Sequence, residues 1–413
     1  MDQPAKLKPQ AALGFIFVTM LIDVIGFGII IPVMPDLIKG LIHGTLREAS
    51  LYSGLMLLAY SVMQFLFSPV IGNLSDKYGR RPILLSSLLG FGIDYLFLAF
   101  APSIGWLFVG RVIAGITGAS FTTASAYIAD ISAPEKRAQN FGMIGVAFGI
   151  GFIIGPFLGG VLGQWNTHYP FFAAAGLALL NAAYGYFILP ESLSVDHRRP
   201  FELKRANPLG SLLQLKKYPS VIGLAVSLFL VYLAVQSVQS VWTFYTILKF
   251  NWNEFLVGSS LAFIGLMIAI VQGLLIRITL PKFGLERSIW MGLLLYSIGL
   301  ILFAFANQTW MMFAFMVPYA LGGIAGPALQ GLMTNQVPAN EQGELQGGLT
   351  SLMSLSSIFG PWIMTSLFYF FTNSKNHIYL PGAPFILGAI LMLMAALLAI
   401  RSFKKGKNLT SAK

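Results

Sequence analysis

Long apolar segments alternate with short polar ones along almost the whole chain. A helix needs about 20 mostly apolar residues to cross the ~30 Å hydrocarbon core of a bilayer. Twelve segments reach this length, and we predict membrane-spanning helices at residues 11–38, 50–73, 82–101, 104–130, 139–162, 169–189, 219–248, 255–277, 286–306, 309–335, 345–371 and 381–402. Because a backbone in lipid must satisfy its own hydrogen bonds, this pattern predicts an all-α membrane protein.

The amino-acid composition leads to the same conclusion. Hydrophobic residues make up 56% of the 413 residues, and charged residues only 10%. A single soluble core stops growing at about 250–300 residues, so this apolar content needs the bilayer as its solvent. The first apolar segment continues well past the length of a signal-peptide core, and we expect it to remain as the first span.

The net charge of +11 is spread unevenly along the chain. With the N-terminus placed inside, 21 of the 26 Lys and Arg residues fall in segments on the inner side of the membrane. Because inner loops carry an excess of Lys and Arg, this bias predicts that both termini are cytoplasmic. The basic charge therefore serves as an orientation signal, and we expect no nucleic-acid partner.

A polar stretch at residues 190–218 divides the predicted spans into six and six. We expect it to be a central cytoplasmic linker between N-terminal (1–189) and C-terminal (219–413) six-helix bundles. Three short motifs of the first half recur in the same order roughly 205 residues later. KYG at 77–79 recurs as KFG at 282–284, and SAPEKRAQNFG at 132–142 recurs as PANEQGELQGG at 338–348. IIGPF at 153–157 recurs as IFGPW at 358–362. Duplicated halves of this kind are typical of transporters, whose substrate sites lie where the repeats meet.

The segment GNLSDKYGRRP at residues 72–82 joins predicted spans two and three. It resembles the loop signature of the major facilitator superfamily at every informative position. Further segments resemble the twelve-span drug/proton antiporters of that superfamily, above all the tetracycline-efflux branch: LIDVIGFGIIIPVMP at 21–35, GRVIAGITGA at 110–119, GFIIGPFLGG at 151–160, NWNEFLVG at 251–258 and PALQG at 327–331.

This resemblance implies two pseudo-symmetric six-helix bundles and transport by alternating access. It implies a monomeric, proton-coupled exporter of a small amphiphilic organic compound or drug, in a bacterial inner membrane, with no enzymatic activity. Two alternatives remain open at this point. The protein could instead carry out uptake or facilitated diffusion of a metabolite such as a sugar, or it could be a non-transporting membrane receptor on the same fold.

The 72–82 loop contains residues that topology alone does not require. Gly72 and Gly79 permit close helix approach and a tight turn. Asp76 can accept hydrogen bonds from backbone donors at a helix N-terminus, and Arg80 and Arg81 can pair with an acidic residue. We predict Asp130 as the partner of Arg80, and the resemblance implies a cytoplasmic latch, although the loop could be basic only for orientation. Pro281 replaces the aspartate in the second half, so we expect the latch in the first half only.

Small residues recur along predicted span five. The series Gly151, Gly155, Pro156, Gly159 and Gly160, preceded by Gly145 and Gly149, would let neighbouring helices approach closely and would allow a kink at the proline. The pattern is also compatible with ordinary packing. In the resembled family such a series marks exchangers rather than symporters, and we expect an antiporter helix here.

Three ionisable residues fall inside predicted spans, where a charge is costly and usually functional. Counted at 1.5 Å per residue, Asp23 and Asp94 lie ~18 Å from the inner ends of their spans and Arg111 ~10 Å from the outer end of its span. All three therefore reach a similar depth. We expect Arg111 to pair with Asp23, which leaves Asp94 as the proton carrier; the alternative is one static polar cluster.

The predicted spans seven to twelve contain no acidic residue and no histidine at mid-membrane depth. Where the resembled tetracycline exporters carry a histidine and an aspartate, this chain has Ile268 and Tyr296, which argues against a metal-chelated drug. We expect neutral amide and aromatic side chains to line a substrate cavity, with the first three preferred: Gln64, Gln236, Gln330, Tyr60, Tyr127, Gln239, Trp242, Tyr245, Gln272 and Asn335.

Other chemistries have little support in the sequence. There is no cysteine, and the four histidines lie in predicted loops or at span ends without ligand spacing, so we expect no metal site. No phosphate-binding P-loop motif occurs, which excludes direct use of ATP through that motif. We expect no cofactor, with the proton gradient as the energy source.

Overall fold

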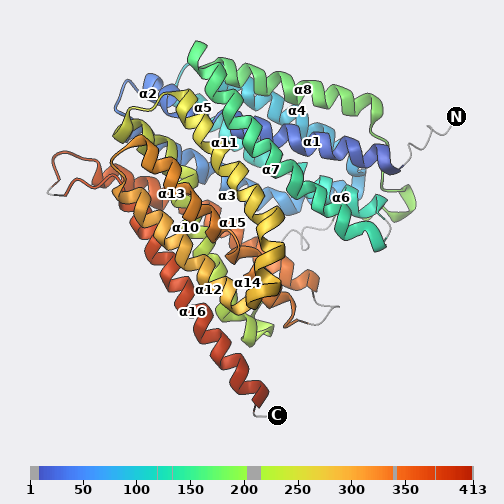
Figure 1. Ribbon diagram of the computed structural model, residues 1–413. Helices are drawn as coiled ribbons and strands as arrows, with labels where there is room; N and C mark the ends of the chain where they lie inside the picture. Colours follow the sequence, from blue (N-terminus) through green and yellow to red (C-terminus); the bar gives the residue numbers. More distant parts are fainter. Residues whose placement is uncertain are drawn as a thin grey trace. The chain divides into compact units, whose positions relative to one another are not determined.

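The computed structural model describes residues 9–118, 120–132, 134–201, 215–337, 342–376 and 378–411, and its regular elements are all helices (Figure 1). The chain divides into two compact units. Unit 1 comprises Met1–His43, Ala59–Asn207 and Asn253–Ala262, and unit 2 comprises Gly44–Leu58, Pro208–Trp252 and Phe263–Lys413. The predicted six-plus-six division with a linker at 190–218 stays a prediction.

Unit 1 is built from the helices of the first half. They are α1 (Pro9–Ile29), α2 (Met34–Ile42), most of α3 (Leu46–Tyr78), α4 (Arg80–Ala99), α5 (Ile104–Thr117), α6 (Ser120–Ile131), α7 (Pro134–Trp165), α8 (Tyr169–Ile188) and the short η1 (Val195–His197). Helix α1 packs against both α7 and α8, and α4 packs against α5 and α8. The start of α11 also belongs to this unit.

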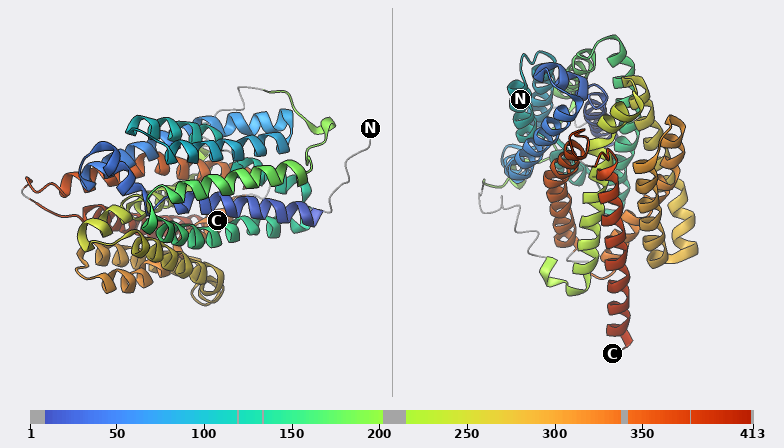
Figure 2. Two further views of the ribbon diagram at one scale, coloured as in Figure 1. Left: turned by 90° about the horizontal axis from the view of Figure 1, so that it is seen from above. Right: turned by 90° about the vertical axis from the view of Figure 1, so that its left-hand side faces the viewer.

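Unit 2 is built from the helices of the second half and the start of α3. They are η3 (Leu215–Lys217), α10 (Pro219–Phe250), the second part of α11 (Glu254–Ile270), the π-helical η4 (Val271–Leu275), α12 (Ile276–Phe305), α13 (Thr309–Gly322), α14 (Ala325–Thr334), α15 (Gln342–Phe371) and α16 (Ala383–Ser411). Helix α16 runs beside α10 and α12, as Figures 1 and 2 show.

Eleven helical segments of the described residues are long and apolar enough to cross a membrane. One of them, Glu254–Phe305, holds 52 residues. At 1.5 Å per residue it would extend about 78 Å, more than twice the ~30 Å hydrocarbon core. Its backbone breaks at Gly284, where φ is 76° and ψ is 169°. It therefore contains two of the twelve predicted spans, 255–277 and 286–306.

The same helix pairings occur in both halves. The first and fifth spans pair as α1 with α7, and their counterparts, the seventh and eleventh, pair as α10 with α15. The third and sixth pair as α4 with α8, and the ninth and twelfth as α12 with α16. The turns of the repeated KYG and KFG motifs also agree, because Gly79 and Gly284 both adopt positive φ, at 105° and 76°. The predicted duplication is thus visible in the fold.

Three predicted spans are each broken into two helices. Span one, predicted at 11–38, ends as α1 at Ile29 and is followed by the separate helix α2. Span four consists of α5 and α6 on either side of Gly118, and span ten consists of α13 and α14 on either side of Gly323. Non-helical backbone at membrane depth is tolerated only where protein or a cavity satisfies its polar groups. At the break in span four, Gln64 Nε2 donates a hydrogen bond to the Gly118 carbonyl oxygen over 3.2 Å.

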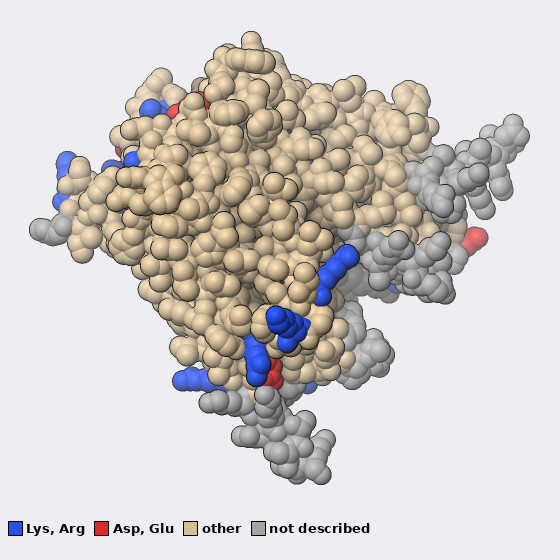
Figure 3. All heavy atoms as spheres, in the orientation of Figure 1, with Lys and Arg blue, Asp and Glu red and all other residues tan. Residues whose placement is uncertain are grey.

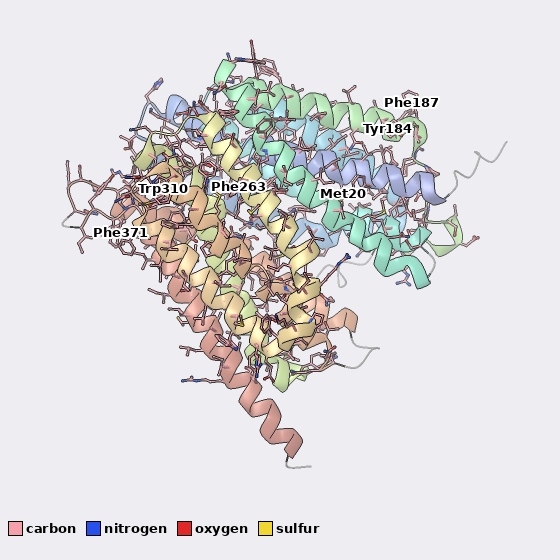
Figure 4. The ribbon with its side chains drawn as sticks, in the orientation of Figure 1. Met20, Tyr184, Phe187, Phe263, Trp310 and Phe371 are labelled. Carbon is pink, nitrogen blue, oxygen red and sulfur yellow. The ribbon has the colours of Figure 1, made fainter. Side chains whose placement is uncertain are left out.

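Large aromatic side chains lie exposed near the helix ends of each unit (Figure 4). In unit 1, Tyr184 and Phe187 project from the last turn of α8, with exposed fractions of 45% and 83%. In unit 2, Trp310 lies in the first turn of α13 and is 60% exposed. Aromatic residues at such positions are typical of the membrane–water interface, where a ring can contact both lipid and water.

Candidate functional site

Arg80 is the centre of a polar cluster at one end of unit 1. Its Nη1 atom lies 2.5 Å from Asp76 Oδ1 and donates to Ser75 Oγ over 2.6 Å. Its Nε atom lies 3.1 Å from Asp130 Oδ2. The predicted contact between Arg80 and Asp130 is therefore present, and it joins the start of α4 to the end of α6. The latch role of this contact stays a prediction.

The backbone donors at the start of α4 are bound by Glu191, while the predicted role of Asp76 at a helix N-terminus stays a prediction. Glu191 Oε1 accepts a hydrogen bond from the Arg80 amide over 2.8 Å, and Oε2 accepts one from the Arg81 amide over 3.2 Å. A carboxylate at this position satisfies otherwise unpaired N–H groups and favours the positive end of the helix dipole. Asp76 lies one helical turn before Arg80 in the chain, so its carboxylate binds the Arg80 guanidinium.

Sequence reasoning missed Glu191, because it was placed in a linker that was expected to be solvated. The start of that segment is in fact bound to unit 1. Ser192 Oγ donates to Asp130 Oδ2 over 3.0 Å, and the Arg199 amide donates to the Asp76 carbonyl oxygen over 3.1 Å. Gly79 contacts the Glu191 carboxylate so closely that a side chain at position 79 would collide with it. The sequence did contain a signal for this contact, because Glu191 is an acidic residue close to the end of predicted span six.

The Arg81 guanidinium has no carboxylate partner within the described residues. Its Nη2 atom donates to the Tyr186 carbonyl oxygen over 2.5 Å, and its guanidinium carbon lies 5.6 Å from the centre of the Tyr186 ring. Arg81 thus fastens the start of α4 to the end of α8. Gly72, the first glycine of the motif, has open space beside its Cα, so the close approach predicted there is absent from the described residues.

Asp94 and Arg111 form a buried ion pair between α4 and α5. Arg111 Nη2 donates to Asp94 Oδ2. Asp94 is 0% exposed and Arg111 is 8% exposed. The expected arrangement, in which Arg111 pairs with Asp23 and leaves Asp94 without an arginine, is therefore wrong. The second carboxylate oxygen, Asp94 Oδ1, is buried without a hydrogen-bond partner among the described residues.

The pairing follows from the α4–α5 hairpin. Only four residues, Phe100–Ser103, join the two helices, so residues at similar distances from the turn lie opposite one another. Gly110 provides the space, because a methyl group at that position would lie 2.8 Å from Asp94 Oδ1. The short loop and the Gly-Arg dipeptide were visible in the sequence and could have identified this pair.

Asp23 lies on α1 within electrostatic reach of the same group of side chains. The charges of Asp23, Asp94 and Arg111 all act on the hydroxyl groups of Tyr60 and Tyr95. Tyr95 lies against α1, since a methyl group at position 26 would be 2.8 Å from its hydroxyl oxygen. The three intramembrane charges are thus gathered in one region of unit 1, as their equal depth predicted.

Gln64 and Tyr60 connect this charged region to the break in span four. Gln64 Nε2 lies 3.2 Å from the Tyr60 hydroxyl oxygen and 3.2 Å from the Gly118 carbonyl oxygen. Both side chains are half-buried on α3. They are the predicted cavity residues of the first half that lie closest to the intramembrane charges.

The glycine–proline series of α7 packs against α1. Gly151 contacts Val24, and a methyl group there would lie 2.7 Å from the Val24 Cβ atom. Gly155 and Gly159 contact backbone atoms of Ile25 and Ile29 in the same way. The spacing of four residues brings the backbones of α1 and α7 together along one face, as small residues do in membrane helices.

Gly160 and the carbonyl oxygen of Pro156 face a second neighbour, the start of α11, while the Pro156 ring lies against Gly28 of α1. A methyl group at Gly160 would lie 2.6 Å from the Glu254 carbonyl oxygen. Gly258 in turn lies against the Pro156 carbonyl oxygen, so the contact is between glycines on both helices. The predicted antiporter helix is therefore a close-packing element with two faces. Gly145 and Gly149 have nothing within 4 Å of an added methyl group.

The amides expected to line a cavity in the second half differ in their exposure and in their contacts. Gln330 Nε2 donates to the hydroxyl oxygen of Tyr232 over 3.0 Å, which parallels the Gln64–Tyr60 contact of the first half. Gln236 packs against Gly360 and is 9% exposed. The remaining amides, Gln239, Gln272 and Asn335, are exposed. Tyr232 was missed, although it precedes Gln236 by one helical turn.

Three aromatic residues predicted to line the cavity are instead buried in helix packing. Tyr127 is 0% exposed and donates its hydroxyl proton to the Pro190 carbonyl oxygen over 2.9 Å. Tyr245 is 0% exposed and donates to the Phe303 carbonyl oxygen over 2.6 Å. Trp242 is 2% exposed, with its ring 5.0 Å from that of Phe303. Their apolar ring surfaces are buried between helices, where they contribute to packing.

The positions that distinguish this chain from the resembled exporters are also packed. The ring of Tyr296 packs edge-to-face against that of Tyr319, with ring centres 5.0 Å apart, and it also lies against Gly322. Ile268 is half-buried on α11. Within the described residues, no group of three His, Cys, Asp or Glu side chains is arranged to hold a metal ion.

Comparison with known proteins gives matches along nearly the whole chain. The sequence model of the Major Facilitator Superfamily matches residues 16–291 and 278–412. Tetracycline resistance protein class C of Escherichia coli is 40% identical over 94% of this chain and 96% of its own. Tetracycline resistance protein class G of Vibrio anguillarum is 37% identical over 96% and 98%.

Solved structures share the fold at lower sequence identity. The human organic anion transporter MFSD10 superposes with a TM-score of 0.71 at 24% identity and covers 96% of this chain and 100% of its own. The nucleoside transporter NupG superposes with a TM-score of 0.77 at 12% identity and covers 95% and 100%.

The Glu191 cap generates a first testable prediction. Glu191→Ala removes the acceptor for two backbone N–H groups of α4 and should destabilise the purified protein by about 2 kcal/mol, the order expected for hydrogen bonds to a charged group. Thermal unfolding in detergent measures the effect. Asp196→Asn, an exposed change in the same segment, is the matched control, and equal melting temperatures for the two variants would refute the capping role.

The buried ion pair gives a second prediction. Arg111→Gln leaves Asp94 charged and buried without its counter-ion, and it should cost about 3–5 kcal/mol of stability. The double change Asp94→Asn with Arg111→Gln should recover part of that loss, since no lone charge remains. Denaturation of all four combinations gives the coupling energy, and strictly additive effects would contradict direct pairing.

The α7 series contains its own control. Gly151→Val places branched carbons against Val24 and should force α1 and α7 apart, which costs about 1–3 kcal/mol. Gly149→Val adds the same atoms to the same helix where a side chain meets open space. We expect a lower melting temperature for the first variant only. A comparable loss in both would mean that glycine is required by α7 itself and not by the contact.

Proposed function

Because this chain belongs to the major facilitator superfamily, and within it to the group that includes the tetracycline resistance proteins, we propose that it exports a small amphiphilic organic compound in exchange for protons. Export would occur by alternating access, in which a central site opens to one side of the membrane at a time. The family consists of transporters, and the apolar helices make this an integral membrane protein.

The observation that carries the proposal is the buried pair of Asp94 and Arg111 beside Asp23. Ionisable groups at membrane depth are costly and mark ion or substrate pathways in transporters. Asp94 uses Oδ2 to bind Arg111, while Oδ1 is buried without a hydrogen-bond partner among the described residues. Oδ1 is thus the atom that would receive a proton.

Protonation would change the balance of this pair. A neutral Asp94 no longer holds the guanidinium by charge, so Arg111 would shift its interaction towards Asp23 or the Tyr60 hydroxyl. Loss of a buried pair is worth about 3–5 kcal/mol. Moving a two-state equilibrium from 1:99 to 99:1 takes about 5.5 kcal/mol. A proton would therefore bias the two access states to the extent that Asp94 binds it more tightly in one state than in the other.

Coupling needs only that proton and substrate favour opposite states. We assign Asp94 as the proton carrier, Arg111 as the residue that responds to its charge, and Asp23 as the second carboxylate of the relay. The Arg80 cluster, defined as Ser75, Asp76, Arg80, Asp130 and Glu191, would act as the cytoplasmic latch that forms in one state and opens in the other.

The cargo would be held by neutral polar groups. We assign the amides Gln64, Gln236 and Gln330 to the substrate site, together with Tyr60, whose hydroxyl oxygen lies 3.2 Å from Gln64 Nε2. The named relatives are tetracycline resistance proteins, so tetracycline is the first compound to test. Since Ile268 and Tyr296 offer no carboxylate or imidazole to a metal chelate, we propose a cargo that does not require a bound metal ion.

The remaining assignments follow the orientation and family. We propose a bacterial inner-membrane location with both termini in the cytoplasm, a monomeric transporting unit, and the proton gradient as the energy source without a cofactor or enzymatic step. The excess of Lys and Arg in predicted inner loops supports this orientation.

Transport in proteoliposomes tests the proposal. Tetracycline with and without Mg²⁺, a fluoroquinolone, a cationic dye and a sugar are loaded in turn, and a pH gradient is imposed. We expect pH-driven movement of an amphiphilic compound by the wild type. Asp94→Asn should reduce the proton-coupled rate at least 10-fold, because the carrier can no longer be charged, while Asp196→Asn should retain the wild-type rate.

Two outcomes would contradict the proposal. Wild-type rates and undiminished proton movement in Asp94→Asn would remove Asp94 from the carrier role. Solute movement down its own gradient that ignores pH in the wild type would instead identify a facilitator. Absence of transport for every compound, in a protein that binds one of them, would favour a receptor.

A further inference from the structure

An apolar groove runs along unit 2 between α11 and α13. Its volume is about 210 Å³, and every residue that lines it is apolar. One wall comes from α11, η4 and the first turn of α12, and includes Ile270, Leu274 and Ile278. The other wall comes from α13 and includes Val317 and Leu321.

Three residues of one groove wall are exposed, as many large apolar side chains of this membrane protein are. Leu274 and Ile278 are 63% and 64% exposed, and Ile270 is 42% exposed. They follow one another at intervals of four residues through the π-helical segment η4. A π turn carries an extra residue and is found mostly at functional positions. The exposed wall of the groove is thus an irregular part of the helix.

Two basic residues of α12, Arg277 and Lys282, lie close in sequence to the lining residues of this groove. Arg277 is three residues after Leu274 and Lys282 is four residues after Ile278, so each basic residue shares a helical face with one residue of the groove wall. Both basic residues are exposed. Neither forms an ion pair with a carboxylate in the part of the chain that the structure describes. Glu286 is the nearest acidic residue in sequence.

The space-filling view shows the same division of chemistry. Lys and Arg side chains gather at the lower end of the visible face, with an acidic side chain among them, and a broad uncharged surface lies above them (Figure 3). Along α12, the exposed Arg277 and Lys282 follow the apolar lining residues in sequence. This combination matches a molecule with an anionic head and a hydrocarbon tail.

We propose that the groove between α11 and α13 binds one anionic phospholipid of the surrounding bilayer, with an acyl chain against Leu274 and Ile278 and the phosphate on Arg277 and Lys282. Basic residues between membrane helices at the inner surface are the usual binding place of anionic lipid headgroups. The groove lies within predicted span 255–277, at a depth that lipid chains reach and soluble partners do not.

Charge separates this occupant from the exported compound. A cationic amphiphile would be repelled by Arg277 and Lys282, and a zwitterionic lipid would gain less from them because its own positive group opposes theirs. Each basic residue near a phosphate is worth about a fivefold change in affinity. Removal of both should therefore weaken binding by about 25-fold, if their contributions add.

Native mass spectrometry of the full chain in detergent tests this proposal. Phosphatidylglycerol or phosphatidylcholine with identical acyl chains is titrated into delipidated protein, and sn-glycerol 3-phosphate is titrated separately. We expect one phosphatidylglycerol bound in preference to phosphatidylcholine, and no binding of the chain-free phosphate. Arg277→Gln with Lys282→Gln should weaken phosphatidylglycerol binding at least 10-fold.

Two further variants separate the head site from the groove. Leu274→Trp with Ile278→Trp fills the groove and should abolish the one-lipid preference while leaving Arg277 and Lys282 in place. Lys375→Gln, an exposed basic residue in another loop, should bind like the wild type. Equal binding of both lipids, unchanged binding in the charge variant, or equal loss in Lys375→Gln would overturn the proposal, and binding of glycerol phosphate alone would reassign the site to a soluble phosphate.

Discussion

A charge inside a bilayer must find its partner within the protein, and the organisation of unit 1 depends on that constraint. Asp94 and Arg111 meet this requirement by facing each other across the α4–α5 hairpin, with Gly110 leaving room for the carboxylate. Because the two helices are held in register by the pair, α4 also presents Tyr95 to α1 and its first turn to the Arg80 cluster. The buried pair and the polar cluster at the helix end are therefore connected through α4.

Close packing without side chains is the second constraint. Lipid offers no hydrophobic force to press helices together, so association relies on contact between backbones. Helix α7 contacts α1 through Gly151, Gly155 and Gly159, and it contacts the start of α11 through Pro156 and Gly160. Because the backbones are in direct contact, the two helices cannot shift slightly against each other without a collision. A helix packed in this way either stays in register or separates, which suits an element that has to move as a unit between two access states.

The sequence was sufficient for the fold because the bilayer simplifies the problem. Span lengths, glycine positions and repeated motifs predicted twelve helices and their duplication, and the turns at Gly79 and Gly284 agree with the repeat. The contact of Arg80 with Asp130 was also predictable, since a motif fixed one partner and depth fixed the other. Within the site, depth alone could gather Asp23, Asp94 and Arg111 but could not choose between two carboxylates; the four-residue loop at Phe100–Ser103 makes that choice.

The remaining errors share a physical origin. Polar and aromatic residues inside spans can face a cavity or another helix, and periodicity does not distinguish the two, so Tyr127, Trp242 and Tyr245 were expected in a cavity and are buried in packing. Glu191 was missed because a charged segment was taken to be solvated, although its carboxylate is bound by the backbone of α4. Tertiary contacts of this kind depend on helix rotation, which a single sequence leaves open.

The central claim is that Asp94 gains and loses a proton within its pair with Arg111. Infrared difference spectroscopy of the purified protein between acidic and alkaline pH measures this without a substrate, because a protonated carboxyl group has its own carbonyl band. A buried carboxyl band should be present in the wild type and in Asp196→Asn, absent in Asp94→Asn, and shifted in its pH dependence by Arg111→Gln. An unchanged band in Asp94→Asn would contradict the account.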